Sequence, residues 1–191
     1  MCIRDRGQDY LNAGLLDRAE ETFNQLIDTQ YGAQARRALL EIYQREKEWE
    51  RAIQAAHALQ ESGAGGRQKE IAQFYCELAQ DELVHTHPDA AITLLEKALA
   101  ADRKSVRATI LLGDAQLAQG DTELALLTWR RVEHQSVPHV ALVAQRLMDG
   151  YRAVGRAQEG VNLLKFYLAE ASSIDFCLLY TSPSPRDQRG S

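Results

Sequence analysis

The sequence predicts an all-α fold, built as an α-solenoid of about five helix pairs in a right-handed superhelix. Three observations lead to this prediction. Good helix formers dominate the 191 residues, and only four prolines interrupt them. No segment shows the period-two alternation of a β-strand. A pattern of small and large apolar residues recurs about every 34 positions, as in arrays of helix pairs.

The clearest copy of this pattern is Leu111–Val132, LLGDAQLAQGDTELALLTWRRV. Gly113 is followed by Ala125 and then by Trp129, at steps of twelve and four residues. Small residues at Gly113 and Ala125 allow two antiparallel helices to approach closely, with Gly120 in the turn between them. A helix pair of this size cannot bury its apolar face alone, so it needs neighbours of the same kind.

Four other stretches repeat these steps and supply the neighbours. The small anchor residues are separated by 33, 39, 34 and 35 positions; they are Ala19, Ala52, Ala91, Ala125 and Gly160. We predict an array over 7–176, with units of about 7–31, 32–62, 68–104, 105–138 and 139–173. The residues expected to pack the repeats are Gly7, Ala19, Phe23, Ala52, Ala91, Gly113, Ala125, Trp129 and Gly160.

The longest step contains residues 62–66, SGAGG, which interrupt helix propensity between units two and three. A phosphate-binding loop is the alternative interpretation, but no Lys-Ser or Lys-Thr follows these glycines. We therefore interpret the segment as a flexible joint at which the phase of the superhelix shifts.

A period near 34 with helix–turn–helix content resembles the tetratricopeptide repeat. Tyr10, Tyr43 and Tyr151 lie three residues after the first small position of their units, while Glu82 and Gln116 depart from this pattern. In such an array the first helices line the concave side, which predicts a mixed polar groove for a peptide or helix partner. The groove candidates are Gln34, Arg37, Glu41, Gln44, Arg45, Gln73, Cys76, Gln80, Leu83, Arg107, Ile110, Asp114, Leu117, Leu142, Gln145, Asp149 and Arg152. The alternative is that most of them are ordinary solvated positions.

Charge and composition exclude several classes of protein. The formal net charge is −5, which argues against a nucleic-acid binder because phosphate contacts favour a basic face. No run of eighteen apolar residues is present in this sequence, so it predicts neither a membrane span nor a secretory signal here. The three cysteines show no metal or redox spacing.

No group of residues indicates catalysis or metal binding. His85 and His87 flank Thr86 beside Pro88, but a metal site needs further ligands and a different spacing on a helix. Cys76 lies in an apolar helical run, where free cysteine behaves as a small hydrophobe. We therefore expect a protein that is not an enzyme and that holds no cofactor or metal in this chain.

The two ends differ from the rest of the sequence. Residues 1–6, MCIRDR, and residues 177–191, CLLYTSPSPRDQRGS, do not continue the helical pattern. They resemble adapter sequence read through as protein at the edges of translated metagenomic fragments. We interpret 1–6 as a non-native end and 177–191 as a non-native disordered tail; an authentic disordered Ser/Pro tail is the alternative.

Whole phrases of the sequence are similar to the lipopolysaccharide assembly protein B (LapB, YciM) family of Gram-negative bacteria. These phrases are DYLNAGLLDRAEETFNQLIDT, ALLEIYQREKEWERAIQAAHAL and EIAQFYCELA. The resemblance implies an adaptor on the cytoplasmic side of the inner membrane, which couples the protease FtsH to the deacetylase LpxC and so restrains lipid A synthesis. An inner-membrane antagonist is a further implied partner.

The family also has an N-terminal transmembrane helix and a C-terminal rubredoxin-like metal domain with paired CxxC motifs. This chain departs from the pattern at both ends, since neither feature occurs in its sequence. We therefore expect an internal part of a longer protein, soluble by itself, without the family's anchor and metal. The alternative function is a general tetratricopeptide module of another assembly or secretion complex.

Overall fold

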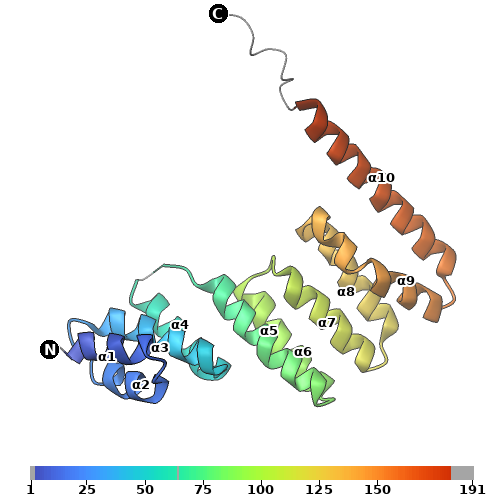
Figure 1. Ribbon diagram of the computed structural model, residues 1–191. Coiled ribbons are helices and arrows are strands. Elements are labelled where there is room, and N and C mark those ends of the chain that lie inside the picture. Colours follow the sequence, from blue (N-terminus) through green and yellow to red (C-terminus); the bar gives the residue numbers. More distant parts are fainter. Residues whose placement is uncertain (1–2, 64, 182–191) are drawn as a thin grey trace, which may run out of the picture.

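Successive α-helices follow one another along the chain in the computed structural model, which describes residues 3–63 and 65–181 and the side chains of 3–63, 65–136 and 138–169 (Figure 1). No strand occurs among the described residues, so the predicted all-α solenoid of five helix pairs is confirmed. The elements are α1 (Ile3–Asn12), α2 (Leu16–Asn24), α3 (Gly32–Glu46), α4 (Trp49–Glu61), α5 (Gln68–Val84), α6 (Pro88–Ala101), α7 (Val106–Ala118), α8 (Thr122–Gln135), the 3-10 helix η1 (Val137–Leu142), α9 (Ala144–Ala153) and α10 (Ala157–Thr181).

Packing follows the order of the chain. Within each pair the two helices contact each other, and the second helix of each pair contacts the first helix of the next. The first helices α5 and α7 also pack against each other directly. Each repeat therefore buries its apolar face against its neighbours, as expected for a solenoid.

The turn within each pair contains one residue with a left-handed backbone. In pairs one, four and five this residue is Gly14, Gly120 or Gly155, with φ of 74°, 92° and 73°. In pairs two and three the position is taken by Lys47 and Thr86, with φ of 59° and 61°. Glycine adopts this conformation without steric cost, whereas a side chain bearing Cβ is strained there.

Helix starts agree with local sequence chemistry. The side chain of Ser105 accepts a hydrogen bond from the backbone N–H of Ala108, and that of Asp121 accepts one from Leu124. Both residues therefore cap the fourth pair. Pro88 occupies the first turn of α6, where its missing N–H has no cost.

The described residues of the joint between the second and third pairs, 62–63 and 65–67, form no helix between α4 and α5, and residue 64 lies outside the described part of the chain (Figure 1). The helices on either side of it nevertheless pack together. Trp49 of α4 stacks on Phe74 of α5 with ring centroids 5.9 Å apart, and Phe74 and Ile71 belong to the same apolar cluster as the first two pairs. The joint therefore connects units that share a core.

Three predicted boundaries differ from the structure. Residues 3–6 belong to α1 and residues 177–181 to α10, so the prediction that both stretches leave the helical pattern is wrong for these residues. Neither stretch contains a proline or glycine that would end a helix. The other residues of the two ends, 1–2 and 182–191, lie outside the described part of the chain. A foreign origin for the ends stays a prediction.

The third difference concerns the boundary between the fourth and fifth units, placed at residues 138 and 139. The 3-10 helix η1 spans this boundary. Ser136 has an extended backbone that ends α8, and Pro138 then begins a tighter turn instead of a regular first helix. The first helix of the fifth pair, α9, is consequently short.

Candidate protein-binding surfaces

The residues predicted to pack the repeats are all buried. Gly113 shows why a small residue is needed, since a Cβ atom at this position would overlap the indole ring of Trp129. Trp129 is 1% exposed, and its Nε1 donates a hydrogen bond of 3.1 Å to the carbonyl oxygen of Ile110. The indole is therefore held across the backbone of α7.

Glycines in the first and fifth pairs have the same role. A Cβ at Gly7 would lie 3.0 Å from Cζ of Phe23, and one at Gly160 would lie 3.0 Å from Cβ of Tyr151. Both positions thus bring a helix backbone against an aromatic side chain of the partner helix. The anchor alanines of the second, third and fourth pairs are fully buried; they are Ala52, Ala91 and Ala125.

The first helix of the second pair presents a polar stripe. Gln34, Arg37, Glu41 and Arg45 are all exposed on α3. Arg45 forms an ion pair of 2.5 Å with Glu41, and its Nη1 donates a hydrogen bond of 3.5 Å to the carbonyl oxygen of Leu11. The stripe is therefore tied to the end of α1.

Three groove candidates of α5 and α7 belong to one network of polar contacts: Gln73, Gln80 and Arg107. Nη1 of Arg107 lies 2.6 Å from Oε1 of Glu77, and its Nη2 donates a hydrogen bond of 2.8 Å to Oε1 of Gln80. Gln73 donates to the same carboxylate of Glu77 at 3.1 Å. The first helices of the third and fourth pairs are thus joined across the predicted groove.

A second ion pair continues this surface from α7 to α9. Arg146 holds Asp114 with both ends of its guanidinium, at 2.6 Å from Nε to Oδ1 and 2.9 Å from Nη2 to Oδ2. Two parallel hydrogen bonds of this kind fix both direction and distance. Further along α9, Gln145 and Arg152 both contact Asp149, at 2.7 Å and 3.2 Å.

Two residues of this network were missed from the sequence. Helical stepping selected Cys76 and Gln145, whereas the bridging residues are the next ones in each helix, Glu77 and Arg146. Cys76 is fully buried, so its assignment to the groove is wrong. The helical period of 3.6 residues allows a step of either three or four residues along one face. Here the residues reached by a step of four, Glu77 and Arg146, face the neighbouring helix. Charge complementarity with Arg107 and Asp114 would have selected the correct residues.

We call the joined surface of α5, α7 and α9 the polar groove. Its three carboxylates, on Glu77, Asp114 and Asp149, are each paired with an arginine. The exposed large apolar side chains on these first helices and on η1 are Val84 at the end of α5, Leu117, which is 43% exposed, and Leu142, which is 54% exposed. Paired charges with apolar side chains beside them favour a polar peptide of low net charge over a strongly charged partner.

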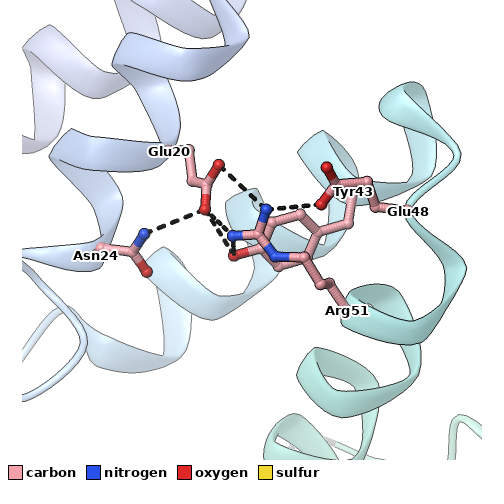
Figure 2. Close-up of polar contacts among 5 residues, drawn as sticks. All are labelled: Glu20, Asn24, Tyr43, Glu48 and Arg51. Atoms are coloured by element: carbon pink, nitrogen blue, oxygen red, sulfur yellow. Dashed lines mark hydrogen bonds and ion pairs between the residues drawn. The ribbon is translucent and has the colours of Figure 1, made fainter.

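A different surface joins the first two pairs on the side of the second helices (Figure 2). The guanidinium of Arg51 lies over the ring of Tyr43, 4.1 Å from its centroid, and forms an ion pair with Glu20 of the preceding pair. The hydroxyl of Tyr43 donates a hydrogen bond of 3.3 Å to the same carboxylate. Burial first, and then the charges of Glu48 and Glu46, raise the pKa of Tyr43.

The fifth pair repeats this bridge. Arg156 lies 5.5 Å from the ring centroid of Tyr151 and pairs at 3.1 Å with Glu123 of the preceding pair. In the first pair Arg18 lies in the same way 5.9 Å from the ring centroid of Tyr10. The recurring tyrosine found in the sequence is thus one part of an arginine–tyrosine pair, and the arginine was missed because its spacing from the tyrosine varies.

The residues considered for catalysis or metal binding are Cys76, which is buried in α5, and His85 and His87, which are exposed beside the turn that follows α5. Burial raises the pKa of the Cys76 thiol to about 11, which keeps it protonated at neutral pH. His87 contacts Glu82 at 2.9 Å on the exposed turn between α5 and α6. Among the described residues no three metal-ligating side chains lie together. No helix in the described part of the chain is long and apolar enough to cross a membrane.

Comparison with known proteins agrees with this architecture. Residues 4–67 and 76–136 match the tetratricopeptide repeat family. The chain is 38% identical to the lipopolysaccharide assembly protein B of Escherichia coli (strain K12) over 92% of its own length and 45% of that protein. It is 29% identical to the protein of the same name from Haemophilus influenzae, over 78% of this chain and 38% of that one. The chain thus spans about half the length of the curated relatives it matches, and the resemblance drawn from its phrases is confirmed.

Solved structures share the fold. The crystal structure of MamA protein has a TM-score of 0.55 and 18% sequence identity, over 89% of this chain and 90% of that one. YrrB, described as a TPR protein with an unusual peptide-binding site, has a TM-score of 0.52 and 14% identity, over 87% and 84% of the two chains. At these identities the likeness concerns the arrangement of helices alone.

Proposed function

This chain belongs to the tetratricopeptide repeat family, and from that premise we propose that it is a non-enzymatic adaptor that binds other proteins through its helical surfaces. The observation that carries the proposal is its 38% identity to the lipopolysaccharide assembly protein B of Escherichia coli, over 92% of the chain. A solenoid of helix pairs offers extended surfaces for partners and needs no catalytic group or cofactor for this role.

The specific role that we propose is in the control of lipopolysaccharide synthesis. The protein would bring LpxC, the deacetylase that commits carbon to lipid A, to the protease FtsH, under restraint by an inner-membrane antagonist. In the full-length protein this adaptor would lie on the cytoplasmic side of the inner membrane, held by an N-terminal helix. Anchoring raises the local concentration of partners at the membrane, and thereby strengthens weak individual contacts.

The polar groove is our candidate for the partner site. Arg107 and Arg146 tie three first helices into one surface, so they set the shape that a partner meets. Leu117 and Leu142 provide exposed apolar contacts on the same helices and on η1. A partner segment with a few apolar side chains and low net charge fits this arrangement best.

The experiment is a chimera of the Escherichia coli relative in which the aligned segment is replaced by residues 7–169 of this chain. We expect the chimera to restore LpxC turnover in cells lacking the relative, as measured by immunoblot after synthesis is stopped. Reversing the groove charges with Arg107→Glu and Arg146→Glu should slow turnover and reduce co-purification of LpxC or FtsH. Arg131→Glu, which changes an exposed arginine of α8, is the matched control.

Two outcomes would contradict the proposal. Normal turnover in the folded double variant would exclude the polar groove as the partner site. A folded chimera at normal abundance that leaves LpxC stable would exclude the specific role. The alternative, a tetratricopeptide module of another assembly or secretion complex, would then be favoured.

A further inference from the structure

A surface hollow lies where α2, α3 and α4 meet, between the first and second helix pairs. It has a volume of about 210 Å³ and is lined by Asn24, Ile27, Arg36, Leu39, Tyr43, Arg51, Gln54, Ala55 and Ala58. Its lining lies inside the array, since α1 precedes these residues and α5 follows them. Pockets for small molecules usually measure about 300–1,000 Å³, so this hollow suits one or two side chains of a larger partner.

Helical spacing brings the lining together. The residues from α3 are separated by three and four positions; they are Arg36, Leu39 and Tyr43. Those from one face of α4 are separated by four and three positions; they are Arg51, Ala55 and Ala58. Such steps place side chains on one face of a helix. Leu39 and Tyr43 are buried and form an apolar floor, while the two alanines are small and leave the space above it open.

The charges around the hollow are unbalanced. Its lining contains two arginines and no carboxylate. Arg51 is neutralised from outside the lining by ion pairs with Glu20 and, at 2.6 Å, with Glu48 (Figure 2). Arg36 is partly buried and forms no hydrogen bond or ion pair with any residue in the described part of the chain. The hollow therefore contains one cationic group whose charge nothing in this part of the chain balances.

The guanidinium of Arg36 lies back against the first turn of α3. A Cβ atom on Gly32, four positions earlier, would lie 3.1 Å from Nη1 of Arg36. This first turn has no acidic side chain, and Tyr31 before it provides no side-chain cap. Free N–H groups and the helix dipole add positive charge at such a start. The local field around Arg36 therefore favours an anionic group.

We propose that this hollow, which we call the inter-pair hollow, binds a segment of a partner protein in which an acidic residue stands beside an aliphatic one. The carboxylate pairs with Arg36, and the aliphatic side chain enters the space over Leu39. Charge decides the occupant, because a cationic segment would meet an unpaired arginine. The inter-pair hollow and the polar groove are formed by different helices, so the two proposals can fail independently.

The test is a titration of the complete, isotope-labelled chain with short peptides, followed by NMR chemical shifts. The first peptide is Ala-Glu-Leu-Ala, acetylated and amidated at its ends. We expect it to shift the backbone amides of lining residues such as Ile27, Leu39 and Gln54 in a saturable way. The uncharged peptide Ala-Gln-Leu-Ala should bind about fivefold more weakly, the loss expected for one partly exposed ion pair.

Two variants separate the charge from the space. Arg36→Glu should reverse the preference, so that Ala-Lys-Leu-Ala binds more tightly than Ala-Glu-Leu-Ala. Ala55→Leu should fill the hollow and abolish the shifts for every peptide. Arg131→Glu, which changes an exposed arginine of α8, is the matched control and should leave binding unchanged. Helix content and thermal melting verify that each variant is folded.

Several outcomes would overturn the proposal. One is the absence of saturable shifts in the folded wild-type chain. Another is equal binding of the Glu and Gln peptides, because Arg36 would then not recognise the carboxylate. Shifts confined to the polar groove would place the peptides there instead. Shifts of the lining residues that depend on protein concentration without peptide, and that Arg36→Glu abolishes, would replace the partner segment by a second copy of the chain.

Discussion

Replacing Gly113 with alanine should destabilise this protein, although alanine is the better helix former. In an exposed helix interior the change stabilises by about 1 kcal/mol. Here the new Cβ would overlap Nε1, Cδ1 and Cε2 of Trp129. The indole cannot withdraw easily, since it is 1% exposed and bonded to the carbonyl of Ile110. Overpacking of this kind costs about 1–3 kcal/mol, so the clash outweighs the gain in propensity and leaves a net loss of about 1 kcal/mol.

The assays are equilibrium unfolding in urea, which gives the free energy of unfolding, and thermal unfolding, which gives the melting temperature, both followed by circular dichroism. A net loss of about 1 kcal/mol should lower the melting temperature of a chain of this size by about 2–4 °C. Trp129→Phe removes Nε1, the indole atom nearest the new Cβ, and leaves a smaller ring, so Gly113→Ala should cost less in that background. A double-mutant cycle measures this coupling. If Gly113→Ala stabilised the wild-type protein, the indole would not lie against α7 and the packing described above would be refuted.

Three further predictions follow from the described contacts. Glu20→Lys should lower the free energy of unfolding by about 0.5 kcal/mol, since its ion pair with Arg51 is partly exposed and screened. Adding Arg51→Glu should recover part of this loss, and 1 M salt should reduce both effects, as measured by unfolding in urea. Burial raises the pKa of Cys76 to about 11, so the folded chain keeps a proton that the unfolded chain begins to lose near pH 8.5. Stability should therefore fall as the pH rises from about 8.5 to 11, and Cys76→Ala should flatten that slope in unfolding titrations; an unchanged slope would refute the assignment. Thr86→Gly should raise the melting temperature by relieving about 1 kcal/mol of left-handed strain, whereas Gly120→Ala should lower it; the same sign for both would contradict the turn geometry.

The fold was predictable because its signals are local and repeated. The anchor Ala125, the turn at Gly120 and the cap at Asp121 each favour the same helix pair, and the same steps recur along the chain. Helix ends were less predictable, because η1 depends on how the chain turns after Ser136 and before α9. That turn is set by packing between the fourth and fifth pairs, which spacing alone does not encode.

The candidate surfaces were predictable only in part. Stepping along the first helices identified Arg107 and Asp114, but it chose Cys76 instead of Glu77. The sequence predicts the period of a helix well, but it predicts poorly which side of the helix faces its neighbour. Adjacent residues differ accordingly: Cys76 is buried, whereas Glu77 forms an ion pair. Arg146 was missed in the same way, because stepping along the helix chose its neighbour Gln145. Its partner Asp114 lies 32 positions earlier in the chain.

The buried core is divided differently from the sequence repeats, and this division has a consequence for hydrogen exchange. One apolar cluster takes Ala108 and Leu112 from α7, while the next takes Ala125 and Trp129 from α8. The fourth pair is therefore shared between two clusters, although it is the most regular copy in the sequence. Local opening follows clusters of contacts, not sequence periods. We expect the amide protons of α7 to exchange with solvent at rates similar to those of α5 and α6. The amide protons of α8 should exchange at rates similar to those of α9.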